Sequence, residues 1–326
     1  ADAVYINVLN AYCKNMIWKN DSLDFSTAFM GTDSSVLYVY GSLILSDSMS
    51  WQFTGDLLFD QYEEENDTAD IIHSRGHEII STVRLQGIND YIKLWDDLTV
   101  FYDTLDPANP VFNYLYHENG TFDLNGKHLN TGGYMSNYKS ERTLNMENAH
   151  ITCVSKSDFE SGKFRAFWLD GTNLTLYAEK SLITKRFQEG AIFSEYGDEL
   201  NFHNIEFKGS ASDSLANRYN TANYNVVTSA TFGTAITKKS PPLSHFTINS
   251  VILNQNNSGI YHDSEINLVI LNGNNCEVAG THDIKRCFVN KTGSIRGIEG
   301  SNEIEYCAFK ASGFFFGNNI FDTLIM

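Results

Sequence analysis

The sequence lacks the features that mark several large protein classes. No run of eighteen apolar residues occurs, and no positively charged start precedes an apolar stretch, so neither a transmembrane helix nor a signal peptide is predicted. P-loop, HExxH, CxxC and GxSxG motifs are missing. With only 4 prolines and 13% aromatic residues, the composition indicates a folded protein whose chemistry is not marked by a short motif.

Basic residues and cysteines are also scarce. The chain has 23 lysines and arginines against 40 acidic residues, a formal net charge of −17. Such a charge argues against nucleic acid and anionic membrane surfaces as partners. The cysteines number 5, an odd count that favours free thiols and assembly in a reducing cytoplasm.

What the sequence does contain is a repeat over its last eighty residues. Five segments align: TINSVILN (247–254), EINLVILN (265–272), DIKRCFVN (283–290), EIEYCAFK (303–310) and NIFDTLIM (319–326). Their first apolar residues are separated by 18, 18, 20 and 16 residues: Ile248, Ile266, Ile284, Ile304 and Ile320. A fixed period of this length is typical of a solenoid, whose units bury their apolar side by stacking on neighbours.

The segments between the repeats decide which solenoid this is. They are rich in Gly, Asn and Ser, which favour turns, and they have no room for a helix of ten residues. Helical repeats are therefore excluded. Leucine-rich repeats place their Asn three residues after the last apolar position, whereas here Asn follows immediately. At about 3.3 Å per residue, a coil of this length fits short strands joined by bends, which predicts a parallel β-helix.

The alignment also predicts which side chains stack. One inward column is expected to hold Val251, Val269, Cys287, Cys307 and Thr323, which makes the two cysteines small buried residues. A second is expected to hold Leu253, Leu271, Val289, Phe309 and Ile325. At one bend Asn254, Asn272 and Asn290 recur, where side-chain amides can hydrogen-bond along the stack.

The rest of the chain is less regular. Residues 1–14 place Val4, Val8, Leu9 and Tyr12 on one face, which predicts a short amphipathic helix. Strands are expected within 36–48, 51–60 and 78–103, and an acidic loop over 61–70. We expect 1–145 to form an N-terminal region with this capping helix and the first irregular coils. Residues 146–326 are expected to form β-helix coils that continue beyond the given chain, because neither end carries a cap.

Two segments before the repeats bear on function. FHNIEFK (202–208) has the spacing of the repeat and is expected to belong to it. Residues 209–244 read as one irregular coil with a projecting loop, and long loops on a rigid scaffold are where function concentrates.

The combination of DAVYINVLNAYCK, YVYGSLILSDS and coils of about 18 to 20 residues resembles the start of bacteriophage tailspike proteins, and looks like the wider pectate-lyase-like superfamily. The resemblance implies a right-handed parallel β-helix and a homotrimer on a phage virion, assembled in the bacterial cytoplasm beside other tail proteins. It further implies binding, and usually cleavage, of a bacterial capsule or O-antigen polysaccharide.

Candidate site residues come from a cluster of carboxylates and aromatic rings between 168 and 199. Hydrolysis of a glycoside needs two carboxyl groups about 5 to 9.5 Å apart. We assign the acid to Glu195 and the nucleophile or base to Asp198, with Glu179 as the neighbour that would replace either. Aromatic faces stack on sugar rings, so substrate binding is assigned to Trp168, Tyr177 and Tyr196. The neighbouring carboxylate of Asp170 is assigned to substrate binding as well. Ordinary solvated turn carboxylates are the alternative.

Two functions therefore stay open from the sequence. One is a polysaccharide depolymerase, with hydrolysis as the first expectation and a lyase as the lesser chemical option. The other is a non-catalytic phage adhesin or structural β-helix that only binds its receptor. No cofactor and no metal are expected, since His262-Asp263 and His282-Asp283, which recur near one corner, fit ordinary turn and surface residues.

Overall fold

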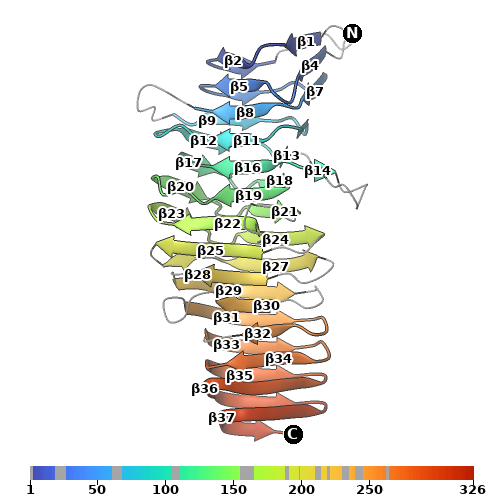
Figure 1. Cartoon of the computed structure of the whole chain (residues 1–326), viewed down its shortest axis with the longest axis vertical. Helices are drawn as coiled ribbons and strands as arrows, with labels where there is room; N and C mark the ends of the chain where they lie inside the picture. The colour runs from blue at the N-terminus through green and yellow to red at the C-terminus, as the bar shows by residue number, and fades with distance from the viewer. Residues whose placement is uncertain are drawn as a thin grey trace. The chain divides into compact units, whose positions relative to one another are not determined.

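The structure is a computed structural model that describes residues 3–18, 27–60, 68–100, 102–103, 111–154, 165–187, 191–197, 199–209, 214–218, 221–229, 235–238, 245–261 and 264–326. All regular structure in these ranges is β-strand, so they contain no helix that could cross a membrane. The chain forms two compact units, one of residues 1–154 and 172–179, the other of 155–171 and 180–326. Each unit is a parallel β-solenoid (Figure 1).

The first unit is built from short strands, three to a coil. Coil by coil, β11, β12 and β13 pair in parallel with β16, β17 and β18. The strands of this unit are β1 (Ala3–Ile6), β2 (Asn10–Cys13), β3 (Met16–Ile17), β4 (Thr27–Gly31), β5 (Val36–Val39), β6 (Leu43–Ile44), β7 (Met49–Phe53), β8 (Asp56–Phe59), β9 (Asp70–His73), β10 (Glu78–Ile79), β11 (Val83–Leu85), β12 (Tyr91–Leu94), β13 (Leu98–Val100), β14 (Tyr102–Asp103), β15 (Val111–Phe112), β16 (Tyr114–His117), β17 (Gly120–Asp123), β18 (His128–Thr131), β19 (Gly133–Ser136), β20 (Arg142–Asn145), β21 (His150–Cys153) and β23 (Leu174–Tyr177).

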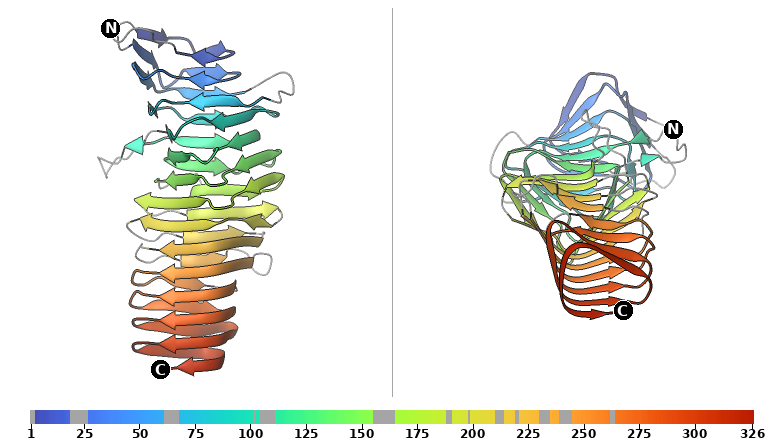
Figure 2. Two further views of the ribbon diagram at one scale, coloured as in Figure 1. Left: turned by 180° about the vertical axis from the view of Figure 1, so that it is seen from behind. Right: turned by 60° about the horizontal axis from the view of Figure 1, so that its bottom comes forward.

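The second unit has longer strands and fewer bends. Successive coils pair β30 with β32 and β34 on one side, and β31 with β33 and β35 on the other. Figure 2 shows these coils from behind and from below. The strands of this unit are β22 (Arg165–Gly171), β24 (Leu182–Phe187), β25 (Ala191–Gly197), β26 (Leu200–Asn201), β27 (Asn204–Gly209), β28 (Ser214–Arg218), β29 (Thr221–Ser229), β30 (Ala235–Lys238), β31 (His245–Leu253), β32 (Gly259–Tyr261), β33 (Ser264–Leu271), β34 (Cys276–Gly280), β35 (His282–Val289), β36 (Gly293–Phe309) and β37 (Gly313–Ile325).

The predicted columns of the repeat are confirmed over four coils. Val251, Val269, Cys287 and Cys307 lie in register on β31, β33, β35 and β36, and all four are fully buried. Both cysteines are free thiols. Ile205 extends the same column through Val227, which confirms that 202–208 belongs to the series.

The amide ladder is confirmed as well. Asn272 donates from Nδ2 to Asn254 Oδ1 at 2.8 Å, and Asn290 donates to Asn272 at 2.7 Å. Asparagine has a second use at the bends, where Asn257 and Asn275, 18 residues apart, have φ values of 55° and 54°. Asparagine tolerates this left-handed conformation better than most residues, so an asparagine-rich sequence suits a chain with so many corners.

Three predictions about the chain's organisation are wrong. The helix over 1–14 is absent: β1 pairs with β4 and β2 with β5, both in parallel. Val4, Val8, Leu9 and Tyr12 are each about half exposed or more, so no apolar helix face is buried. A short isolated helix is marginal in water, and pairing with the next coil satisfies the same backbone groups.

The other two errors concern register and the region 209–244. The fifth repeat is shifted by one residue, because Cys307 pairs with Leu324 rather than Thr323, and Ile304 with Phe321 rather than Ile320. Within 209–244 the described residues form β28, β29 and β30, with Leu215, Val227 and Ile236 fully buried. This segment therefore supplies more of the solenoid than the one irregular coil predicted, and residues 210–213, 219–220, 230–234 and 239–244 lie outside the described residues. The acidic segment 61–67 lies outside the described residues.

Candidate functional site

Strands β22 and β25 bring three of the predicted site residues together on one outer face. The two strands pair in parallel, with Trp168 opposite Phe193 and Asp170 opposite Glu195. Leu169, which lies between Trp168 and Asp170 in the sequence, is fully buried in the solenoid interior. Because alternate side chains of a strand point to opposite faces, Trp168 and Asp170 share the outer face with Phe193 and Glu195.

The indole of Trp168 is held in place from two sides. Its Nε1 donates a hydrogen bond to Glu195 Oε1 at 3.0 Å. Its ring stands edge-on to Phe193, with centroids 6.3 Å apart and planes at 78°. Phe193 is buried in a small outer cluster with Ala191 and Ala216, and Trp168 packs against that cluster. The result is an oriented aromatic ring directly beside a carboxylate.

Asp170 and Glu195 form a pair of neighbouring carboxyl groups with little contact with water. Asp170 is 3% exposed and Glu195 is 7% exposed. Neighbouring strands lie about 4.8 Å apart, which places the two side chains beside each other at their backbone origin. Arg218 occupies the next register position after Glu195, on β28.

A bend directly after Glu195 changes where the following residues point. Tyr196 and Gly197 have φ values of 54° and 74°, and the register shifts between Asp170 and Gly171. A Cβ on Gly197 would lie 2.1 Å from the carbonyl carbon of Gly171, so only glycine fits there. Regular strand geometry would turn Tyr196 inward, and the bend explains why it is 36% exposed instead.

The remaining predicted residues lie elsewhere. Asp198 lies outside the described residues. Glu179 and Tyr177 belong to the first unit, where both are exposed and Tyr177 pairs with Asn145. Glu199 accepts a hydrogen bond from Asn223, one coil further on. The outer-face group in the second unit thus comprises Trp168, Asp170 and Glu195, with Tyr196 at the bend.

Sequence reasoning missed a buried polar network in the first unit. His117 Nδ1 lies 2.9 Å from the Tyr134 hydroxyl, and its Nε2 lies 3.0 Å from the Gly120 carbonyl oxygen. Arg142 donates from Nη1 to Ser136 O at 2.6 Å. Burial lowers the pKa of His117 to about 4 and raises the pKa of Tyr134. These residues are almost fully buried, which assigns them to the core rather than to a binding surface.

A second polar group lies on the outer face of the first unit. Arg84 donates from Nη1 to Glu118 Oε1 at 2.9 Å and stacks over the Tyr116 ring, with Cζ 4.2 Å from its centroid. Burial, with Glu118 nearby, raises the pKa of Tyr138 to about 12. Glu118 also accepts from Gln86 Nε2 at 3.1 Å. Both carboxylate oxygens of Glu118 accept hydrogen bonds from residues of the neighbouring coil, so we interpret this group as an ion pair that stabilises the packing of the coils.

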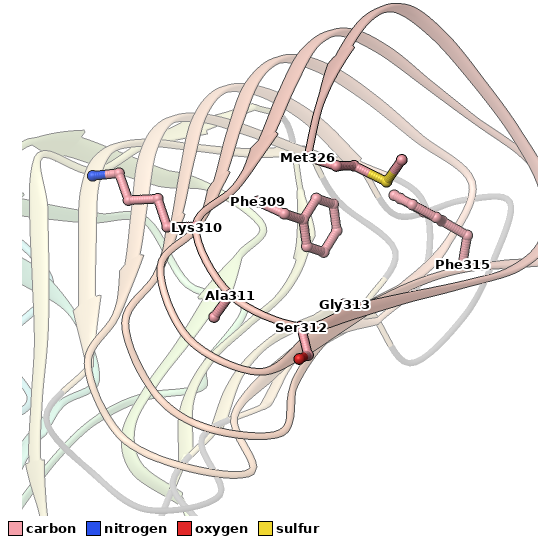
Figure 3. A pocket seen from close by; sticks show the side chains of 7 residues that line it. All are labelled: Phe309, Lys310, Ala311, Ser312, Gly313, Phe315 and Met326. Atoms are coloured by element: carbon pink, nitrogen blue, oxygen red, sulfur yellow. The ribbon is translucent and has the colours of Figure 1, made fainter.

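Other features offer less chemistry. A pocket of about 390 Å³ lies at the last coil, where Phe309, Phe315 and Met326 turn their side chains toward one another and Lys310 points away (Figure 3). Its lining residues include Ser312 but no Asp, Glu, His or Cys. Of the two His-Asp pairs, 262–263 is outside the described residues, and His282 is buried with Nδ1 2.8 Å from Ser264 Oγ.

Among the described residues, no three His, Cys, Asp or Glu side chains come close enough together to hold a metal ion. Comparisons with protein families, with curated proteins and with solved structures find no match. What is established is the fold: a parallel β-solenoid in each unit, consistent with a pectate-lyase-like β-helix.

Proposed function

We propose that this chain is the β-helical part of a tailspike-like phage receptor-binding protein that hydrolyses a bacterial surface polysaccharide. In this proposal the solenoid is right-handed, and the protein acts as a homotrimer on the virion. The observation that carries the proposal is the group on β22 and β25, where Trp168 donates to Glu195 and Asp170 lies in register beside it.

The spacing of the two carboxyl groups favours one type of hydrolysis. Retaining glycosidases hold their carboxyl groups about 5 to 5.5 Å apart, whereas inverting enzymes need about 6.5 to 9.5 Å to fit a water molecule. The backbones of in-register neighbours on parallel strands are about 4.8 Å apart, a spacing compatible with the first range. We therefore propose a retaining mechanism with Asp170 and Glu195 as the two catalytic residues.

We assign the role of each acid from the hydrogen bond that Trp168 donates to Glu195. A donor to a carboxylate favours its ionised form, so Glu195 acts as the nucleophile. It attacks the anomeric carbon while Asp170 gives its proton to the departing glycosidic oxygen. Water, deprotonated by Asp170, then releases the sugar from Glu195. These roles differ from the expectation from sequence, in which Glu195 was the acid and Asp198 its partner.

The second candidate function is an adhesin that binds the same class of polysaccharide without cleaving it. The low exposure of Asp170 and Glu195 favours this alternative, because substrate must reach both groups. Binding and cleavage therefore have to be measured separately.

The test uses purified protein and a panel of bacterial capsule and O-antigen polysaccharides. Chain length is followed by size-exclusion chromatography, new reducing ends are counted, and binding is measured by surface plasmon resonance. Glu195→Gln and Asp170→Asn should each lower cleavage by at least a hundredfold and preserve binding, since the amides keep the shape. Glu265→Gln, the same change at an exposed position of β33, should leave both unchanged. Binding without any cleavage by the unaltered protein would favour the adhesin.

A further inference from the structure

Two histidines of the first unit form a stacked pair that the proposed function does not use. His128 on β18 and His150 on β21 are in-register neighbours on parallel strands. Their rings are almost parallel, with centroids 4.1 Å apart and planes at 4°. Both side chains are partly exposed on the outer face, because Leu129 and Ile151, the next residues of each strand, are fully buried.

The Nε2 atoms of both rings face the hydroxyl group of Thr152. Nε2 of His128 lies 2.8 Å from the Thr152 hydroxyl oxygen, and Nε2 of His150 lies 3.4 Å from it. A hydroxyl has a single proton, so it can donate to only one of the two nitrogens. If both contacts are hydrogen bonds, the other nitrogen must carry its own proton and donate to the hydroxyl oxygen. The two Nε2 atoms thus lie on either side of one hydroxyl oxygen.

We propose that His128 and His150 bind a divalent transition-metal ion of the zinc, nickel or copper class through their Nε2 atoms. Imidazole is a preferred ligand of these ions. With Zn–N distances of 2.0–2.1 Å, two nitrogens of a tetrahedral site lie about 3.4 Å apart. The ring centroids are 4.1 Å apart and the planes only 4° from parallel, so the two in-plane lone pairs run side by side, and binding one ion requires the rings to tilt toward each other by tens of degrees. Rotation about the Cβ–Cγ bond, which is a soft torsion, supplies this tilt and aims both lone pairs at the metal.

Oxygen atoms beside the pair fit the remaining positions. The Thr152 hydroxyl already contacts both nitrogens, and Asn130 stands opposite Thr152 in the register. The exposed Asp97 carboxylate accepts the backbone N–H of His128 at 2.8 Å and adds negative charge nearby. Since no third His, Cys, Asp or Glu joins the pair within the described ranges, solvent completes the coordination. The result is an exchangeable site, weaker than a closed structural zinc site.

The experiment titrates chelator-treated, dialysed protein with Zn²⁺ in a calorimeter and with Cu²⁺ in electron paramagnetic resonance. One Zn²⁺ should bind per chain, and the bound Cu²⁺ spectrum should show two equatorial imidazole nitrogens. His128→Ala and His150→Ala should each weaken binding at least tenfold, and the double variant should abolish the two-nitrogen signal. His77→Ala is the matched control, because His77 instead bonds singly to the Ser46 carbonyl oxygen at 2.8 Å.

A spectrum with fewer than two nitrogens, or equal Zn²⁺ affinity in the double variant and the unaltered protein, would overturn the proposal. So would the absence of binding at millimolar Zn²⁺. Thr152→Val separates metal binding from folding, because it keeps both rings and removes the shared hydroxyl. It should retain the two-nitrogen signal with affinity lowered less than in either histidine variant. Loss of the signal in Thr152→Val with native circular dichroism would also contradict the assignment.

Discussion

Acidification from pH 7 to pH 4 should destabilise the first unit through the buried histidine His117. Its Nε2 faces the Gly120 carbonyl oxygen, which can only accept, so this nitrogen carries the proton. Nδ1 must then accept from the Tyr134 hydroxyl, and the neutral ring satisfies both partners. A second proton, on Nδ1, would force the Tyr134 hydroxyl to turn its own proton away and would place a charge in a site closed to water.

The magnitude follows from the pKa of His117. Burial lowers it from 6.5 to about 4, against the effect of the Gly120 carbonyl, which raises it. The unfolded chain therefore binds more protons than the folded one between these values, so stability rises with pH across that window. The contribution is complete above pH 6.5 and is lost as the pH falls through 4. A difference of 2.5 pKa units corresponds to about 3 kcal/mol of unfolding free energy.

Two measurements test this prediction. Histidine-selective NMR follows the His117 ring directly, and this titration does not require two-state unfolding. Urea unfolding at pH 7.5, 5.5 and 4 compares the unaltered protein with His117→Gln, which keeps a donor and an acceptor but cannot titrate. The variant should lose about 3 kcal/mol less stability between pH 7.5 and 4. A pKa near 6.5 for His117, or the same pH dependence in both proteins, would refute the reasoning.

Three further predictions concern the second unit and are checked by urea unfolding. Cys307→Ala should cost about 1–3 kcal/mol, because it leaves a gap in a fully buried column; no loss would contradict the column. Asn272→Ala should cost about 1–3 kcal/mol, since it removes one amide hydrogen bond to each neighbouring coil. Asp283→Asn should raise the urea midpoint, because Asp283 stands in register between Glu265 and Glu303, all exposed. That gain should shrink as salt is added, and a salt-independent gain would exclude charge repulsion as its cause.

The repeat could be predicted from the sequence because its columns depend on local rules that every coil obeys. Cys287 lies 18 residues after Val269, and Asn272 directly follows Leu271, the last buried residue of its strand. The position of each residue within the repeat was therefore enough to predict that Cys287 is buried and that Asn272 lies at a bend. The predicted register of the fifth repeat is wrong because that repeat was aligned at a spacing of 16 residues instead of 18 or 20. The spacing does not show at which bend the chain is shorter. At the chain start, a helical period in Val4, Val8 and Tyr12 competes with pairing to the next coil. Pairing between segments far apart in sequence is invisible to a local pattern.

The candidate site could be predicted only in part. Trp168, Asp170 and Glu195 were chosen for their chemistry, and the register that makes them neighbours came from the structure. His117 and Tyr134 are 17 residues apart and belong to no motif, so nothing in the sequence links them. His128 and His150 become neighbours only once β18 pairs with β21. Contacts across coils depend on the length of every turn between them, which composition does not fix.

The most direct test of the proposed function is the length of a bound polysaccharide over time, with the unaltered protein and with Glu195→Gln. The unaltered protein should shorten the chain, and NMR of the first product should show a retained anomeric configuration. Glu195→Gln should bind the same polysaccharide and leave its length unchanged. Equal cleavage by Glu195→Gln would remove the β22–β25 group from the mechanism. An inverted first product would exclude the roles assigned to Asp170 and Glu195.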